Sequence, residues 1–446
     1  MQQSHLFYQT RTRRPLLDRA EGIYMWDVNG KRYIDGSSGA MVSNIGHSNP
    51  NVLVAMKVQM EKSTFGYRLH FENEPAEMLA ARVAELSPEG HNKVFFVSGG
   101  SEAVESAIKL ARQYAVTKNQ PERWKVISRS PSYHGSTMGA LSLTNYEPLN
   151  APFKPLYPDM PKIPAPTCYL DRDNLSDHDK GLKYADFLRE KIIESGPETI
   201  LAFIMEPVGG ASTGALVAPD SYYQRIRDIC DEFGIFLIYD EVMTGVGRTG
   251  KFLAAEHWNI NPDIIVTSKG FGAGYVPLGA MTARDYIVDA VLDGGGFQHG
   301  YTYAGNPIAC AAGLAVINEI YEKDMMTNTA YVGTKLMAGL NQLKQQYPFI
   351  GDVRGKGLLT AFELVSDRET MEPLPADLSI YNRLVDIAYD KGLIIYSRRT
   401  RNGIKGDHFL VCPPMITTEE QINDILDIIN ASLDVLAHEF SLPKDF

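Results

Sequence analysis

Short apolar runs of strand length alternate with longer helical patterns through the middle of this 446-residue chain. Polar, Gly-rich or Pro-containing residues follow these runs, which are KVFFVS, KVISR, LAFIME, IFLIYDE and IIVTSK, between Lys93 and Lys269. The alternation is typical of a mainly parallel sheet with crossover helices. It predicts an α/β fold, in which ligands bind beyond the carboxyl ends of the strands.

The pattern changes after about Glu322. A helix is followed by the strand LLTAFELV, a helix over Ile380 to Lys391, the strands LIIYS and HFLVCP, and a final helix from Thr418. Near the N-terminus, IYMWDVNGKRYIDGSSG is typical of a hairpin with Asn29-Gly30 as its turn. We expect the two ends of the chain to pack together as a smaller α+β layer.

These patterns divide the chain into two domains. We expect a large domain over residues 60–322 and a small domain that residues 1–59 and 323–446 build together. Within the large domain, the stretch from Pro152 to Pro166 is expected to be a surface excursion, because its prolines disfavour helix interiors and central strands.

Composition narrows the classes of function. A net charge of -11 and a pI near 5.5 argue against a nucleic-acid surface. No apolar run approaches the length of a membrane span, and the first residues lack the apolar region of a secretion signal, so we expect a cytoplasmic protein. Widely spaced cysteines without a CxxC or a histidine cluster indicate reduced structural thiols and no metal site; they are Cys168, Cys230, Cys310 and Cys412.

Three features point to one kind of chemistry. In SGGSEAVESA, Gly99 and Gly100 permit a tight turn before a helix N-terminus, where an anionic phosphate is stabilised. Asp240 ends an apolar strand, where a carboxylate needs a partner. Lys269 follows another strand and precedes a glycine-rich loop that leaves its amine free to face a cleft.

Each feature also has an ordinary explanation. A Gly-Gly-Ser turn before a helix is commonly an N-cap, Asp240 could cap a turn, and most lysines are solvated. Together, however, they supply what pyridoxal phosphate (PLP) requires: an anion cradle for the phosphate, a carboxylate for the pyridine nitrogen and a lysine for the aldehyde.

The motifs that contain these residues extend over most of the chain. From about Gly22 to Ile429, the sequence resembles the class III (ω-type, subgroup II) aminotransferases of PLP fold type I. The matching stretches are GIYMWDVNGKRYIDGSSG, NIGHSNP, FFVSGGSEAVESAIKLAR, SYHGST, IMEPVGG, YDEVMTGVGRTG, PDIIVTSKGFGAGYVPLGA, HGYTYAGNPIACAAG, VRGKGLLTAFEL and GDHFLVCPPMITTEEQI.

The resemblance implies a role for each site residue. Lys269 is expected to form the Schiff base and to move the proton, Asp240 to pair with the ring nitrogen, and Tyr133 to stack on the ring. Thr302 is expected to reach the phosphate of a partner's cofactor across a homodimer interface, in a dimer or a higher oligomer. The remaining cofactor contacts that the resemblance implies are Gly100, Ser101, His134, Gly135, Glu206 and Val242.

The implied reaction is ping-pong transamination. An amine or an ω- or β-amino acid donates its amino group, the cofactor alternates between PLP and pyridoxamine phosphate, and an α-keto acid such as pyruvate or 2-oxoglutarate accepts the group. Ala211 stands where ornithine- and GABA-type members carry a glutamate, which argues against those two activities.

Substrate contacts are expected from Met41 and from one arginine. Met41 lies in the region where several aromatic-amine enzymes have Trp. Arg398, Arg399 and Arg401 all follow the GLI strand, and we choose Arg398 as the carboxylate ligand. Arg354, in VRGKG, is expected to tie the small domain together.

Two other readings stay open. The same scaffold also supports aminomutases, decarboxylating transaminases and lyases. Outside PLP chemistry, a glycine turn in an α/β sheet could bind a dinucleotide for hydride transfer, but no GxGxxG opens a helix after the first strand. A non-catalytic relative is disfavoured because Lys269 and Asp240 are both present.

Overall fold

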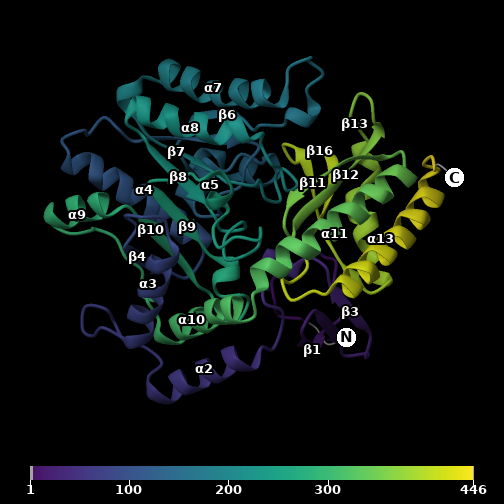
Figure 1. Cartoon of the computed structure of the whole chain (residues 1–446), viewed down its shortest axis with the longest axis horizontal. Helices are drawn as coiled ribbons and strands as arrows, with labels where there is room; N and C mark the ends of the chain where they lie inside the picture. Colours follow the sequence, from purple (N-terminus) through teal and green to yellow (C-terminus); the bar gives the residue numbers. More distant parts are fainter. Residues whose placement is uncertain (1–3, 445–446) are drawn as a thin grey trace.

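A seven-stranded sheet forms the centre of the larger part of the protein (Figure 1). The computed structural model describes residues 4–444. The strand order is β4-β10-β9-β8-β7-β5-β6; the last five run parallel, whereas β10 is antiparallel to both of its neighbours. The strands are β4 (Lys93–Val97), β5 (Lys125–Ser130), β6 (Lys162–Pro164), β7 (Ile200–Met205), β8 (Phe236–Asp240), β9 (Ile264–Thr267) and β10 (Gly279–Ala283).

Alternate residues of these strands enter two hydrophobic cores, one on each face of the sheet. Leu237 and Tyr239 pack with helices of one core, while Ile238 between them packs against α4 (Gly100–Thr117) in the other. Burial on both faces explains why the strands are continuous apolar runs. The first core also includes residues of α2 (Pro50–Lys62), α3 (Glu74–Leu86), α7 (Asp177–Ser195), α8 (Asp220–Phe233) and α10 (Pro307–Glu322), and the second includes residues of α5 (Met138–Leu143) and α9 (Asp285–Asp293).

The smaller part contains a second, mainly antiparallel sheet with three helices (Figure 1). Its core joins residues of all three helices to Phe362 and Phe409, whose rings stack. The elements are α11 (Met325–Gln346), β11 (Ile350–Lys356), β12 (Leu359–Asp367), β13 (Glu372–Pro373), α12 (Ile380–Asp390), β15 (Tyr396–Arg401), β16 (Lys405–Val411) and α13 (Glu419–Phe440).

The N-terminal strands join this part through a third sheet. The order is β1-β2-β3-β14, and Ile34 of β3 pairs in parallel with Leu393 of β14. The elements are β1 (Leu17–Glu21), β2 (Tyr24–Asp27), β3 (Arg32–Asp35), α1 (Ser38–Met41) and β14 (Leu393–Ile394); α6 (Glu147–Asn150) is a short helix beyond the large sheet.

Several predicted elements are confirmed. Strands β2 and β3 form the expected hairpin around Asn29-Gly30, and the final helix begins after Thr418 with a capping box to Gln421. The predicted α/β class, with a large parallel-rich sheet and a small α+β part, is also confirmed. The division at residues 60 and 323 stays a prediction, and residues 1–3 and 445–446 of the predicted small domain lie outside the described residues.

Two predictions need correction. The run LIIYS is not one strand, because it is split at Ile395 between β14, which pairs with the N-terminal sheet, and β15, which pairs with β16. The stretch from Pro152 to Pro166 is more than an excursion: it contributes β6 at the sheet edge, where Pro164, the last residue of that strand, is tolerated.

No helix among residues 4–444 is long and apolar enough to cross a membrane.

Candidate active site

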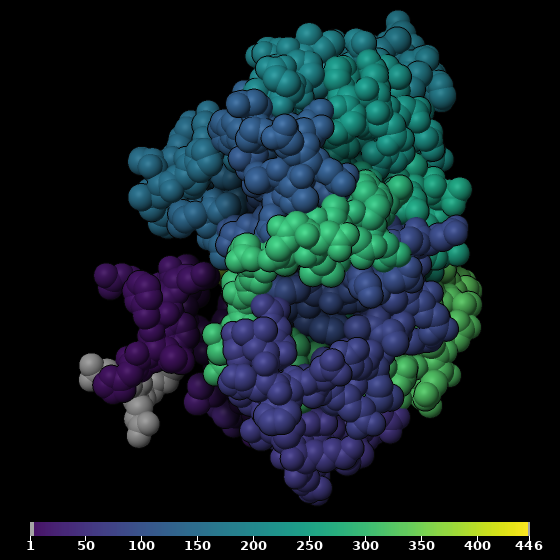
Figure 2. All heavy atoms as spheres, turned by 90° about the vertical axis from the view of Figure 1, so that its left-hand side faces the viewer, coloured from purple at the N-terminus to yellow at the C-terminus, as the bar shows by residue number. Residues whose placement is uncertain are grey.

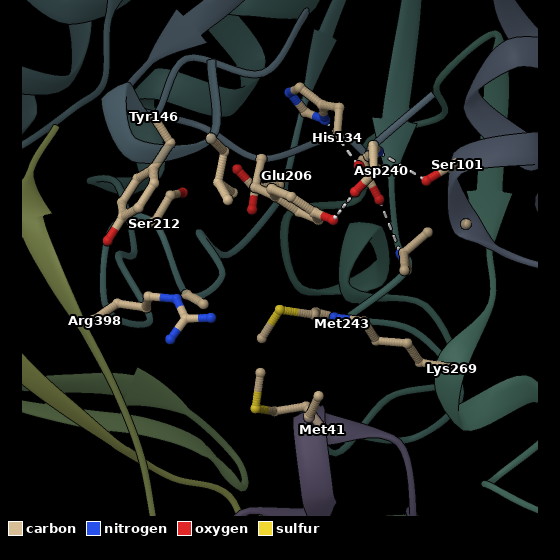
Figure 3. A pocket seen from close by; sticks show the side chains of 18 of the residues that line it. Met41, Ser101, His134, Tyr146, Glu206, Ser212, Asp240, Met243, Lys269 and Arg398 are labelled. Carbon is tan, nitrogen blue, oxygen red and sulfur yellow. Dashed lines mark hydrogen bonds and ion pairs between the residues drawn. The ribbon is translucent and has the colours of Figure 1, made fainter. Parts of the chain in front are cut away.

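The carboxyl ends of the parallel strands open into a cavity of about 420 Å³ (Figure 3). Residues that follow β4, β5, β7, β8 and β9 line it, since parallel strands bring these ends to the same edge of the sheet. From the small part and the N-terminal segment come Tyr396, Arg398 and Met41. Predicted residues at this cavity are Met41, Gly100, Ser101, Tyr133, His134, Gly135, Glu206, Ala211, Asp240, Val242, Lys269 and Arg398.

Lys269 lies two residues beyond β9, at the start of a short 3-10 helix. Its φ of +46° is in the left-handed region, which non-glycine residues adopt at an energetic cost that surrounding structure must offset. Burial lowers the pKa of Lys269, while the charges of Asp240 and Glu206 act in the opposite direction. The lysine is therefore biased toward the neutral amine, which is the nucleophilic form.

Asp240 is 4% exposed at the end of β8. Its Oδ2 accepts a hydrogen bond of 2.8 Å from Nδ1 of the buried His134, and its Oδ1 accepts one of 3.1 Å from the Val242 amide. The backbone at His134 is itself held, because its amide donates to Thr144 Oγ1 at 2.8 Å. These contacts fix the direction of the Asp240 carboxylate and leave it facing the cavity.

Glu206 follows β7 and is buried beside Arg129. Arg129 Nη2 donates to the Glu206 carbonyl at 2.6 Å and lies 3.8 Å from its Oε2, while the Gly210 amide donates to its Oε1 at 2.9 Å. Burial raises the pKa of Glu206, and His134 and Arg129 lower it. Glu206 is thus a second acidic group at the inner end of the cavity, partly compensated by its neighbours.

The loop after β5 is fastened to the start of α4. The Ser136 amide donates to Ser101 Oγ at 3.0 Å, and Gly135 has a φ of +142°. A Cβ on Gly135 would lie 2.6 Å from Ser101 Oγ, and one on Gly100 would lie 3.0 Å from a Val242 methyl. Only glycine allows this close approach, and among the described residues no side chain caps the first turn of α4. The geometry leaves uncapped helix N–H groups for an anion.

The structure separates the three neighbouring arginines on β15. Arg399 pairs with Asp407 at 2.9 Å, and Arg401 lies 3.5 Å from Glu363. Arg398 lines the cavity, stacks over Tyr396 and pairs with no carboxylate in the part of the chain that the structure describes. Of these three arginines, Arg398 alone presents to the cavity a guanidinium without a carboxylate partner among the described residues.

Thr302 is the one predicted site residue that does not line this cavity within the described chain; it is exposed, in the segment before α10. Arg354, as expected, is part of a small-domain network and also donates to the Thr213 carbonyl at 2.9 Å.

Sequence reasoning missed several lining residues and one buried partner. Arg129 ends the apolar run KVISR, and a charged residue in such a run could have signalled a buried ion pair. The other missed residues carried no signal, because none of them stands in a sequence pattern that indicates a site; they are Gln9, Ala40, Ser136, Tyr146, Leu149, Ser212, Met243 and Tyr396.

The chain belongs to the class III aminotransferases: the model of the family Aminotransferase class-III matches residues 8–433. The putrescine–pyruvate aminotransferase of Pseudomonas aeruginosa is 33% identical over 430 residues, 95% of this chain and 91% of that protein. A leucine/methionine racemase of Thermococcus litoralis is 35% identical over 417 residues, 93% of this chain and 89% of that protein. The crystal structure of a PLP-bound amine transaminase from an uncultivated Pseudomonas species is similar with a TM-score of 0.91 at 33% identity, covering 97% of this chain and 99% of that chain.

The protein is thus a PLP-dependent aminotransferase of fold type I. The residues of the cavity fit this cofactor. Lys269 offers a desolvated amine, Asp240 a carboxylate fixed by His134, and the uncapped start of α4 beside Gly100 an anion cradle.

Proposed function

We propose that this aminotransferase moves an amino group from an amine, or from an ω- or β-amino acid, to an α-keto acid such as pyruvate or 2-oxoglutarate. The observation that carries the proposal is the uncompensated Arg398 in a wall that is otherwise largely apolar around Met41 and Ala211. One cation can hold the carboxylate of an acceptor, while the apolar wall accepts a donor without a carboxylate. The putrescine and pyruvate in the name of the Pseudomonas relative are in keeping with this pair.

The proposal gives each residue around the cofactor a task. Bound PLP supplies an aldehyde for the amine and a ring that withdraws electrons from the reacting carbon. Lys269 binds the cofactor covalently and then takes the proton from the carbon that carries the amino group. Asp240, oriented by His134, keeps the ring nitrogen protonated.

The remaining contacts hold the cofactor. Tyr133 and Val242, which line the cavity, would contact the ring, and Gly100 and Ser101 would hold the phosphate at the start of α4. The close approach at Gly135 keeps the tyrosine loop against α4, and Glu206 completes the inner end of the site.

We further propose that the enzyme is a homodimer, with the active sites at the interface. Figure 2 shows the face where α2 and α3 (blue) lie beside the segment before α10 (green). The Tyr303 ring packs at 5.8 Å from that of Phe65 while both remain exposed, next to the exposed Thr302. Exposed apolar groups on these elements and on the loop between α2 and α3, which a second copy would cover, include Leu53, Val54, Val58, Met60, Phe65, Met78 and Tyr303.

A cytoplasmic location belongs to the same proposal. All four cysteines are free thiols, as in reducing compartments, and the net charge of -11 disfavours nucleic acid as a partner. We also propose the division into a PLP-binding domain over residues 60–322 and a small domain from the two chain ends.

A second candidate function is another PLP reaction at the same site, by an aminomutase, a decarboxylating transaminase or a lyase. The racemase relative, at 35% identity, is a reason to keep this candidate, because its printed activity is not transamination. The cofactor residues alone do not separate these reactions.

The test has two parts. Borohydride reduction of the yellow holoenzyme should fix the cofactor on the peptide that contains Lys269, as read by mass spectrometry. A panel of amines and ω-amino acids with pyruvate or 2-oxoglutarate should then yield alanine or glutamate. If no donor yields either product while an amino ketone is isomerised, the substrate proposal fails.

A further inference from the structure

Ser212 carries a buried hydroxyl in the cavity wall. Its side chain is 3% exposed, it lines the same cavity as Lys269, and its Oγ has no hydrogen-bond partner among residues 4–444. Buried hydroxyls are nearly always paired, because an unpaired one loses its bonds to water without replacement. An unpaired hydroxyl in a substrate cavity therefore suggests a ligand atom as its partner.

Tyr146 adds a second donor at the same end of the cavity. Its ring is 5% exposed, and its Oη accepts a hydrogen bond of 3.1 Å from the Arg399 amide. Burial raises the pKa of Tyr146, whereas the Arg399 amide and the charge of Arg398 lower it, so the hydroxyl is protonated and lies within the field of Arg398. No acceptor for the Tyr146 proton is found in the described chain, which leaves that proton available to a ligand.

The three donors lie apart from Asp240 and Lys269 in the cavity, and Glu206 lies between the two groups in Figure 3. Figure 3 shows Ser212, Tyr146 and Arg398 on one side and Asp240 and Lys269 on the other. The two acids are already engaged: His134 binds Asp240, and Arg129 and the Gly210 amide bind Glu206. The outer end therefore offers a guanidinium and two hydroxyl donors, a set that matches the oxygens of a carboxylate.

We propose that Ser212 is a specificity-determining residue that, together with Tyr146, donates a hydrogen bond to the substrate carboxylate held by Arg398. This inference rests on the proposed function and deepens it, since it names the group that completes the carboxylate site. The Ser212 hydroxyl is already shielded from water in the protein, so a ligand oxygen gains a hydrogen bond without a further desolvation penalty on the serine.

The position of this set also defines the substrate class. Met41 and Met243 lie between Arg398 and Lys269 in Figure 3, and both line the cavity. Thioether side chains are apolar and adapt to irregular shapes. We therefore infer that the preferred carboxylated donor carries its amine at Lys269, an apolar carbon chain along the methionines, and its carboxylate at Arg398, as β- and ω-amino acids do.

The test replaces the hydroxyl and separates carboxylated from uncharged reactants. In Ser212→Ala, we expect KM for pyruvate and KM for β-alanine to rise about tenfold, equivalent to about 1.4 kcal/mol. The rate of the first half-reaction with a primary alkylamine that has no carboxylate should stay within about twofold of wild type. Calorimetry with butyrate, which cannot react, should show the same tenfold weakening in the dissociation constant.

Three further variants check the assignment. Ser212→Thr keeps the hydroxyl and should restore most of the affinity, and Tyr146→Phe should weaken carboxylate binding as Ser212→Ala does. Thr213→Val is the matched control, because Thr213 Oγ1 is also buried and unpaired among the described residues but does not line the cavity. It should leave KM unchanged.

The outcomes are distinct. If Ser212→Ala changes the alkylamine and pyruvate reactions equally, or leaves butyrate binding unchanged, the inference about Ser212 is wrong while the aminotransferase proposal stands. If wild-type enzyme transfers no amino group from any donor, the proposed function fails, and butyrate binding still decides whether Ser212 contacts a carboxylate.

Discussion

Nδ1 of His134 donates a 2.8 Å hydrogen bond to the Asp240 carboxylate, and both side chains are almost completely buried. His134 lies in the loop after β5 and Asp240 is the last residue of β8, so the sheet itself fixes their separation. A buried carboxylate held by a ring N–H keeps one orientation, which a cofactor nitrogen can use without reorganising the site.

His134→Ala removes this support and should slow catalysis. Loss of a hydrogen bond to a charged group is worth about 1.5–3 kcal/mol, so kcat should fall by about 10- to 100-fold. KM should change little because His134 binds no substrate. His134→Asn, which retains an N–H donor, should recover part of the rate in steady-state assays; equal kinetics for Ala and Asn would argue that the hydrogen bond is unimportant.

Arg398 and Arg399 should respond differently to substitution. Arg398→Ala should raise KM for keto acids at least about tenfold, since a charge-assisted hydrogen bond to carboxylate is lost, with an unchanged unfolding midpoint. Arg399→Ala should instead lower stability by about 3–5 kcal/mol, because it leaves the buried Asp407 without its cation. Kinetics and denaturant unfolding of both variants check this; a reversal of the two effects would assign the carboxylate to Arg399.

Thr302 should act on the partner's active site. Lys269→Ala and Thr302→Asp protomers should each form inactive homodimers, whereas dimers mixed by refolding should regain activity. In a mixed dimer one site carries both lesions and the other carries none, so about half of the wild-type activity per mixed dimer is expected if Thr302 works across the interface. A mixed population that stays inactive would mean that Thr302 serves its own chain, or no site.

Glu241 should give stability a pH dependence that is opposite to that of most carboxylates. It is fully buried next to Asp240, accepts a 2.9 Å hydrogen bond from the Ala255 amide, and burial raises its pKa to about 7 from an ordinary 4.5. Between these pH values the folded protein binds the proton more tightly than the unfolded chain does, so stability falls as pH rises, by up to about 3 kcal/mol.

Glu241→Gln removes this titration. The variant should therefore gain stability relative to wild type as pH rises from about 4.5 to about 7, measured by urea unfolding at several pH values. Glu232→Gln, at the surface of α8, is a suitable control that should leave the slope nearly unchanged. Parallel curves for wild type and Glu241→Gln would show that Glu241 is ionised in the folded protein.

The sequence was sufficient for the strands that are buried on both faces, because continuous apolar runs mark them. It did not predict β10. The residues of this strand, GAMTA, are small, and the sequence pattern there indicates a glycine-rich loop. Such a strand is stabilised by its neighbours β9 and β4 rather than by its own side chains.

The residues of the candidate site were likewise predicted from the sequence only in part. Lys269 and Asp240 stand at strand ends, where topology alone brings them together. Arg398 could not be separated from Arg399 and Arg401 by pattern, because the choice depends on the partners Asp407 and Glu363, which lie elsewhere in the chain. Ser212 is marked only by a missing hydrogen bond, which no sequence pattern records.

The parallel pairing of Ile34 with Leu393 has a consequence for biosynthesis. During translation, β3 emerges early but its neighbour β14 is made only after most of the chain, several tens of seconds later at roughly 5–20 residues per second. The large sheet contains no strand from either terminus and can assemble on the ribosome during this interval. The N-terminal sheet is therefore expected to be completed among the last events in the maturation of each new chain.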